Sequence, residues 1–129
     1  MRKIFFFFFL ALAFVSCRDS MTMIKDTFDI ELPKSVKYYS EQEQWNDFNG
    51  DGYRIVIYDV KDGHELEVQS LMESKGAIYM KNYLNSELKE CVLSDSVYIL
   101  EKDLINDDEL RRLLYDPTQK KIIYHYMFY

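Results

Sequence analysis

Lys121–Tyr129, KIIYHYMFY, is the stretch that decides the fold, because β-branched and aromatic side chains fill almost every position. Such residues favour the pleated, half-buried surface of a β-strand. Both faces of this predicted strand are largely apolar. Tyr53–Val60, YRIVIYDV, has the same character and is bounded by Gly52. We therefore predict a second strand there, either covered on both faces or central in its sheet.

Shorter patterns predict further strands. Phe28–Leu32 alternates apolar and polar residues, and Ser35–Tyr39 is also β-like. Val97–Leu100, VYIL, follows the turn residues Ser94-Asp95-Ser96. The chain holds 11 tyrosines, whose apolar rings and polar tips suit half-buried sheet faces. The composition therefore favours a β-rich domain.

Two segments fit a helical period. Residues 64–74, HELEVQSLMES, place Val68, Leu71 and Met72 on one face. Residues 106–115 begin with a capping residue and acidic side chains that complement a helix dipole, and three leucines then form a stripe. In the alternative, RLLYD at 112–116 is a strand that a hairpin through PTQK joins to KIIYHYMFY. Residues 77–93 receive no assignment.

Together these elements predict an α+β domain with an antiparallel sheet of four or five strands and one or two helices packed on one face. The patterns do not give the order of the strands. The globular domain is expected to span residues 28–129. A polar segment without periodicity, residues 17–27, is expected to precede it as a tether.

The first residues, MRKIFFFFFLALAFVSCRDS, predict an exported protein. The apolar run Ile4–Val15 is shorter than the roughly 20 residues that a membrane-spanning helix needs. A positive start, a short apolar middle and small residues near its end are typical of a secretory signal peptide, here residues 1–16.

Phe14-Val15-Ser16-Cys17 resembles the lipobox of bacterial lipoproteins. The resemblance implies cleavage before Cys17, a diacylglyceryl group on its sulfur and a fatty acyl chain such as palmitate on the new amino terminus. It also implies a location in the cell envelope, and Arg18 in place of aspartate favours the outer membrane. In its order of features the chain is similar to small uncharacterised bacterial lipoproteins. The alternative is an ordinary signal peptide with a nearby cysteine.

The charge of the chain limits its partners. The net charge is −6, and removal of Arg2 and Lys3 with the signal peptide leaves −8 on the side chains. Such a charge argues against nucleic acid and against docking on anionic lipid headgroups. The predicted contacts are therefore a membrane, reached through the lipid anchor, and a protein partner.

One loop resembles a calcium-binding sequence. Asp47, Asn49 and Asp51 in DFNGDG have the spacing that opens an EF-hand loop. The ninth and twelfth positions are Ile55 and Tyr58, so the closing carboxylate is missing. The dipeptides Asn-Gly and Asp-Gly also favour a plain turn, which is the preferred interpretation.

No other motif indicates chemistry or a cofactor. Cys91 has no CxxC neighbour, and neither His64 nor His125 has a second ligand at metal spacing. The sequence therefore favours a lipid-anchored binding or scaffolding protein rather than an enzyme. The alternatives are an envelope-side inhibitor or immunity protein that caps a basic partner, and an enzyme with a carboxylate site outside known motifs.

Overall fold

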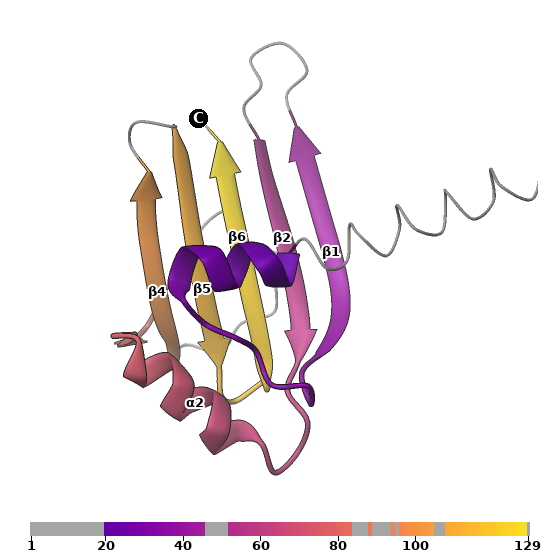
Figure 1. Cartoon of the computed structure of the whole chain (residues 1–129), viewed down its shortest axis with the longest axis vertical. Helices are drawn as coiled ribbons and strands as arrows, with labels where there is room; N and C mark the ends of the chain where they lie inside the picture. Colours follow the sequence, from indigo (N-terminus) through magenta and orange to yellow (C-terminus); the bar gives the residue numbers. More distant parts are fainter. Residues whose placement is uncertain are drawn as a thin grey trace, which may run out of the picture.

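The computed structural model describes residues 20–45, 52–83, 88, 94, 96–104 and 108–128 (Figure 1). Within these residues the chain forms two helices and six strands. The first helix covers residues 20–28 and is called the N-terminal helix below. The other elements are β1 Lys37–Trp45, β2 Gly52–Asp59, α2 Glu65–Ser74, β3 Ile78–Lys81, β4 Ser96–Leu104, β5 Glu109–Asp116 and β6 Lys121–Phe128.

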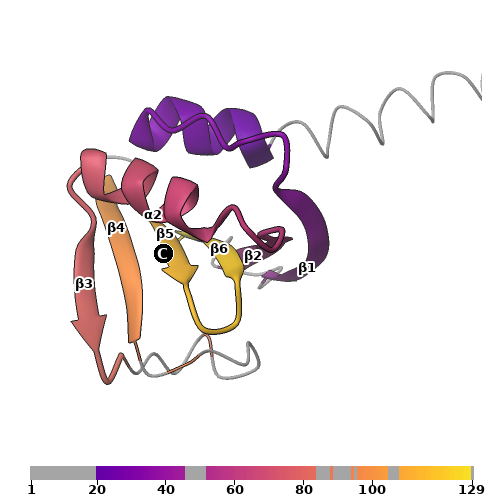
Figure 2. The same ribbon diagram turned by 90° about the horizontal axis from the view of Figure 1, so that it is seen from below.

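The six strands form one antiparallel sheet in the order β1-β2-β6-β5-β4-β3. α2 follows β2 in the chain and connects it to the opposite edge of the sheet, where β3 begins (Figure 2). β3 to β6 then run side by side, and β6 closes the sheet by pairing with β2. The α+β class is confirmed. The sheet has six strands where four or five were predicted, because both the unassigned stretch after Gly76 and residues 109–116 contribute strands.

The helix predicted over residues 106–115 is wrong, and the alternative hairpin is correct. Leu110 and Leu114 lie on one side of β5 while Leu113 lies on the other, and all three are buried. The leucine spacing fits a helical stripe, but β5 pairs on both edges, with β4 and β6, and is buried on both faces. Tertiary packing therefore decides the conformation of this segment.

Residues 20–27 of the segment predicted as a tether, residues 17–27, lie in the N-terminal helix, which corrects that part of the prediction. Ile24 is fully buried in the core, and the Arg111 guanidinium donates a 2.5 Å hydrogen bond from Nη1 to Thr27 Oγ1. Asp29 follows the helix in a left-handed conformation with φ of 56°. The strand predicted over Phe28–Leu32 is absent, although Ile30 in that segment is fully buried.

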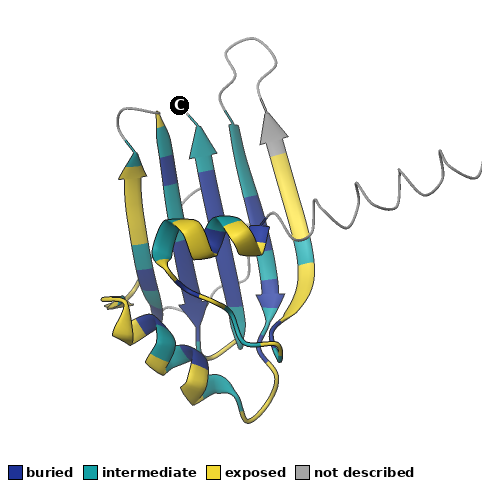
Figure 3. Ribbon diagram, viewed as in Figure 1, coloured by how far each residue is buried: buried dark blue, intermediate teal, exposed yellow. Residues whose placement is uncertain are grey.

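The strongest strand predictions are confirmed, and burial explains them. Alternate residues of β2 enter two different hydrophobic clusters: Val56 and Tyr58 belong to the first and Ile55 to the second. β6 divides in the same way, with Ile122 in the first cluster and Ile123 in the second. Both strands lie inside the sheet and are buried along much of their length (Figure 3). Continuous apolar sequence thus reflects burial on both faces.

The first cluster includes both helices. Ile24 of the N-terminal helix and Val68 and Met72 of α2 pack with the strand residues of that cluster. The helix predicted over 64–74 is therefore confirmed, with its predicted apolar face toward the sheet. The strand residues of the second cluster are Ile55, Val97, Ile99, Leu114 and Ile123, and Leu88 packs with them.

Candidate functional site

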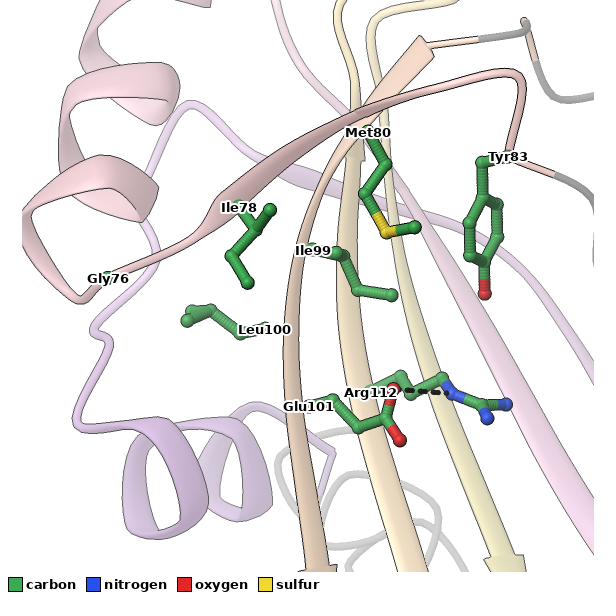
Figure 4. Close-up of a pocket in the computed structure, with 8 residues that line it drawn as sticks. All are labelled: Gly76, Ile78, Met80, Tyr83, Ile99, Leu100, Glu101 and Arg112. Carbon is green, nitrogen blue, oxygen red and sulfur yellow. Dashed lines mark hydrogen bonds and ion pairs between the residues drawn. The ribbon is translucent and has the colours of Figure 1, made fainter.

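A cavity of about 450 Å³ lies beside the edge strand β3 (Figure 4). Its walls come from β3, β4 and β5, together with residues just before and after β3. The lining residues are Gly76, Ile78, Met80, Tyr83, Ile99, Leu100, Glu101 and Arg112. We call the part formed by Ile78, Met80, Ile99, Glu101 and Arg112 the β3 groove. The close-up shows Ile78, Ile99 and Met80 near one another, with Glu101 and Arg112 below them.

The upper wall of the β3 groove is an exposed apolar strand. β3 pairs with β4 on one side only, and no strand pairs with its other edge in the part of the chain that the structure describes. All four of its residues are exposed, and the side chain of Ile78 is 65% exposed. Natural sheets usually protect their edges with charge, proline or a covering element. An apolar, open edge therefore indicates a contact surface.

The floor of the β3 groove carries a row of polar side chains. The antiparallel register places Glu101, Arg112 and His125 opposite one another on β4, β5 and β6. Arg112 Nε lies 3.3 Å from Glu101 Oε2, and Arg112 Nη1 lies 3.5 Å from His125 Nδ1. A guanidinium group has only donors, so His125 Nδ1 accepts and the ring proton sits on Nε2. This row presents one half-exposed carboxylate and one largely covered cation to the groove.

His125 is buried and neutral. Burial lowers its pKa from 6.5 to about 4, and the positive charge of Arg112 adds to this effect. The Tyr53 ring packs against the imidazole edge to face, with centroids 6.2 Å apart. His125 therefore holds Arg112 in place as a neutral acceptor over the physiological pH range.

The low pKa of His125 predicts an acid-sensitive stability. Below pH 6.5 the unfolded chain gains a proton on this imidazole, whereas the folded chain does not until about pH 4. The free energy of unfolding is therefore expected to fall by about 2 kcal/mol between pH 7.5 and pH 5 from this residue alone. Urea denaturation at the two pH values measures the change.

Two variants test this assignment. His125→Gln is expected to remove about 2 kcal/mol of the fall in the free energy of unfolding between pH 7.5 and pH 5. His64→Gln is expected to leave this fall unchanged. His64 is the matched control because its Nδ1 lies 3.1 Å from Glu67 Oε2 at the exposed start of α2. An unchanged pH slope in His125→Gln would contradict the assignment.

A second polar cluster lies in the first hydrophobic core. Tyr126 is opposite both Arg54 and Arg111, and Arg111 stands 5.1 Å over its ring. Glu109 accepts hydrogen bonds from Arg111 Nη2 and from the Tyr126 hydroxyl, each at 3.0 Å. Glu41 pairs with Arg54 at 3.1 Å. The cations are thus neutralised within the fold, and the cluster joins β1, β2, β5 and β6.

Buried tyrosines in this region are not activated. Burial raises the pKa of Tyr58 to about 12, and burial also raises the pKa of Tyr124. The Tyr124 hydroxyl is buried with no hydrogen-bond partner among the described residues. Both groups stay protonated at neutral pH and are poor nucleophiles or bases. The arrangement is that of a packed core.

The residues predicted to carry chemistry lie outside the part of the chain that the structure describes. The lipid attachment residue Cys17, the calcium candidates Asp47, Asn49 and Asp51, and Cys91 all lie outside the described residues. Among the residues that are described, no group of three His, Cys, Asp or Glu side chains is placed to hold a metal ion.

Sequence reasoning missed the β3 groove. Glu101, Arg112 and His125 are far apart in the chain, and only the pairing of β4, β5 and β6 aligns them. The one available signal was the apolar stretch Ala77–Met80 between Gly76 and Lys81. That stretch was not assigned to any element.

None of the described helices is long and apolar enough to cross a membrane. Comparison of the chain with protein-family models, with curated proteins and with solved structures finds no match.

Proposed function

We propose that this chain is a lipid-anchored protein of the bacterial cell envelope that binds a protein partner through the β3 groove. The anchor would be the acylated Cys17, and Arg18 after it favours the outer membrane. The observation that carries the binding role is the open apolar edge of β3 above a cavity with a charged floor.

The chemistry of the β3 groove suits an extended peptide segment. A strand that adds to β3 would satisfy the backbone groups on its open edge, and alternate side chains would enter the cavity. Covering Ile78 or Met80 would contribute roughly 1.5–3 kcal/mol for each side chain. Arg112 and Glu101 would fix orientation by hydrogen bonding at the cavity floor.

We also infer that both helices pack on one face of the sheet. Support comes from Ile24, Val68 and Met72, which share the first cluster. Ile99 belongs to the second cluster, and β3 pairs Ile78 with it. The β3 groove would then open on the face away from the helices, where neither helix obstructs a partner.

A photo-crosslinking amino acid at Ile78 tests the proposal in intact cells. The variant is expected to give a discrete crosslinked band in the membrane fraction. The matched control carries the same amino acid at Leu66, which is 75% exposed on α2. Equal crosslinking at the two positions, or none at Ile78, would contradict binding at the β3 groove.

The anchor has its own test. Mass spectrometry of the mature protein is expected to show a chain that starts at Cys17 and carries fatty acyl groups. Cys17→Ser is expected to abolish this modification. An intact leader, or an unmodified thiol at Cys17, would contradict the anchor without bearing on the β3 groove.

An envelope-side inhibitor that caps a basic partner is the alternative, and it rests on the net charge of −8 after signal removal. Electrostatic capping would weaken steeply with salt, whereas an apolar strand addition would not. Crosslinking at Ile78 in low and high salt therefore separates the two functions.

A further inference from the structure

The N-terminal helix leaves little chain between the proposed anchor and the folded domain. Its first described residue, Ser20, is buried, and Ile24 one turn later is fully buried in the first cluster. The Thr27–Arg111 hydrogen bond fixes the other end of the helix to β5. The folded part of the chain therefore begins by residue 20.

Only residues 18 and 19 separate Cys17 from Ser20. An extended chain spans at most ~3.6 Å per residue, so Ser20 lies within about 11 Å of Cys17. If Cys17 carries acyl chains that enter a bilayer, Ser20 must lie at or just above the headgroups. The side of the domain around Ser20 is thus brought to the membrane surface.

Exposed side chains of the N-terminal helix and of β1 suit that position. The Tyr58 side chain lies close to Ser20, and the Tyr38 ring packs edge to face on Tyr58 with centroids 6.4 Å apart. Tyr38 is 50% exposed, Tyr39 next to it is 58% exposed, and Met21 is 37% exposed. Tyr38 lies on the face of β1 that packs with Tyr58, whereas Tyr39 lies on the other face, under Lys121. We call the exposed side chains that flank this edge of the sheet, Met21, Tyr38 and Tyr39, the β1 patch.

The β1 patch has the character of a membrane-interface surface. Tyrosine is enriched at the headgroup level because its ring is apolar and its hydroxyl is polar. Lys121 Nζ stands 3.7 Å over the Tyr39 ring and also pairs with Asp59, so its charge is compensated inside the fold. Contact here would not depend on anionic lipid, which agrees with the acidic charge of the domain.

We propose that the β1 patch rests on the lipid bilayer that holds the acyl chains of Cys17. This inference rests on the proposed lipid anchor. It also sets the direction of the partner site, since β1 and β3 are the two edges of the sheet. Strands in a sheet are about 4.8 Å apart, which puts β3 roughly 24 Å from β1. The β3 groove then faces away from the membrane.

Lipid quenching of a fluorophore tests the contact on the full, acylated protein. The protein is purified from bacterial membranes and reconstituted in phosphatidylcholine vesicles with brominated acyl chains. A polarity-sensitive probe is attached at Tyr39→Cys in a Cys91→Ala background, and Leu66→Cys is the matched control. Probe fluorescence at position 39 is expected to be about twofold lower than in unbrominated vesicles, with no change at position 66.

A second reporter and a linker variant complete the test. Met21→Cys is expected to respond like Tyr39→Cys, so the test survives if one variant does not fold. Insertion of roughly 20 glycine and serine residues after Arg18 is expected to restore full fluorescence at position 39. Equal fluorescence at positions 39 and 66 in acylated protein would overturn the membrane contact and leave the anchor intact. Contact that persists with the long linker would overturn the role of the short connection, and absence of acylation would overturn the anchor itself.

Discussion

Leu113→Ala is expected to lower the free energy of unfolding by about 3 kcal/mol, within the usual range for a buried leucine. Leu113 has 0% exposure, belongs to the first cluster and lies opposite Tyr124 on β6 and Leu100 on β4. Truncation removes buried methyl groups and leaves a cavity in the first cluster. Urea denaturation at pH 7.5 measures the loss as a lower midpoint with an unchanged slope.

Leu66→Ala is the matched control for this prediction. The leucine side chain is the same, but it is 75% exposed on α2, so the substitution is expected to change stability by less than about 0.5 kcal/mol. Similar losses in the two variants would show that the core is not packed around Leu113.

Asp116→Ala is expected to have an effect of similar size for a different reason. The Asp116 carboxylate is fully buried and accepts hydrogen bonds from Ser94 N at 2.7 Å, Ser94 Oγ at 2.5 Å, Thr118 N at 3.0 Å and Gln119 N at 3.1 Å. It therefore shapes the β5–β6 turn and also ties residue 94 to it. Removing the carboxylate breaks four hydrogen bonds to a charged acceptor, at an expected total cost of about 3 kcal/mol.

Three further variants separate the parts of this network. Asp116→Asn keeps the shape but puts an amide donor where one carboxylate oxygen accepts, so it is expected to be intermediate. Ser94→Ala removes one hydroxyl donor and is expected to cost about 1 kcal/mol. Asp62→Asn changes an exposed aspartate paired with Lys120 and is expected to leave stability nearly unchanged. An Asp116→Ala protein as stable as Asp62→Asn would contradict the role of the buried carboxylate.

The part of the fold that could be predicted is the part in which local pattern and packing agree. β2 and β6 have apolar residues on both faces, and both strands are inside the sheet. α2 has Val68 and Met72 on its buried side, as the helical period requires. In these segments composition, period and burial favour the same conformation.

β5 and the N-terminal helix could not be predicted from local pattern. The leucines of β5 satisfy a helical stripe and a two-sided strand equally well, and only its pairing with β4 and β6 decides between them. The N-terminal helix buries Ser20 and Ile24 and packs Met23 and Phe28 partly buried against the first cluster, but polar residues interrupt this short apolar face. Its stability depends on docking against the sheet, which sequence alone does not reveal.

The β3 groove could not be predicted from the sequence, because its formation depends on the order of the strands in the sheet. Ile78 and Met80 form a contact surface only because β3 is the outermost strand, and the order of strands has no signature in the sequence. Glu101, Arg112 and His125 meet only through the register of three strands. A site made by strand alignment leaves no motif.

The pairing of β2 with β6 has a consequence for how fast the chain folds. Asp59 and Lys121 lie 62 residues apart yet face each other at the end of this pair. Contacts that close such long loops slow folding, and sheets dominated by them reach the native state in milliseconds to seconds. A newly made chain would thus remain unfolded for milliseconds or longer, until the β1–β2 hairpin joins the other four strands.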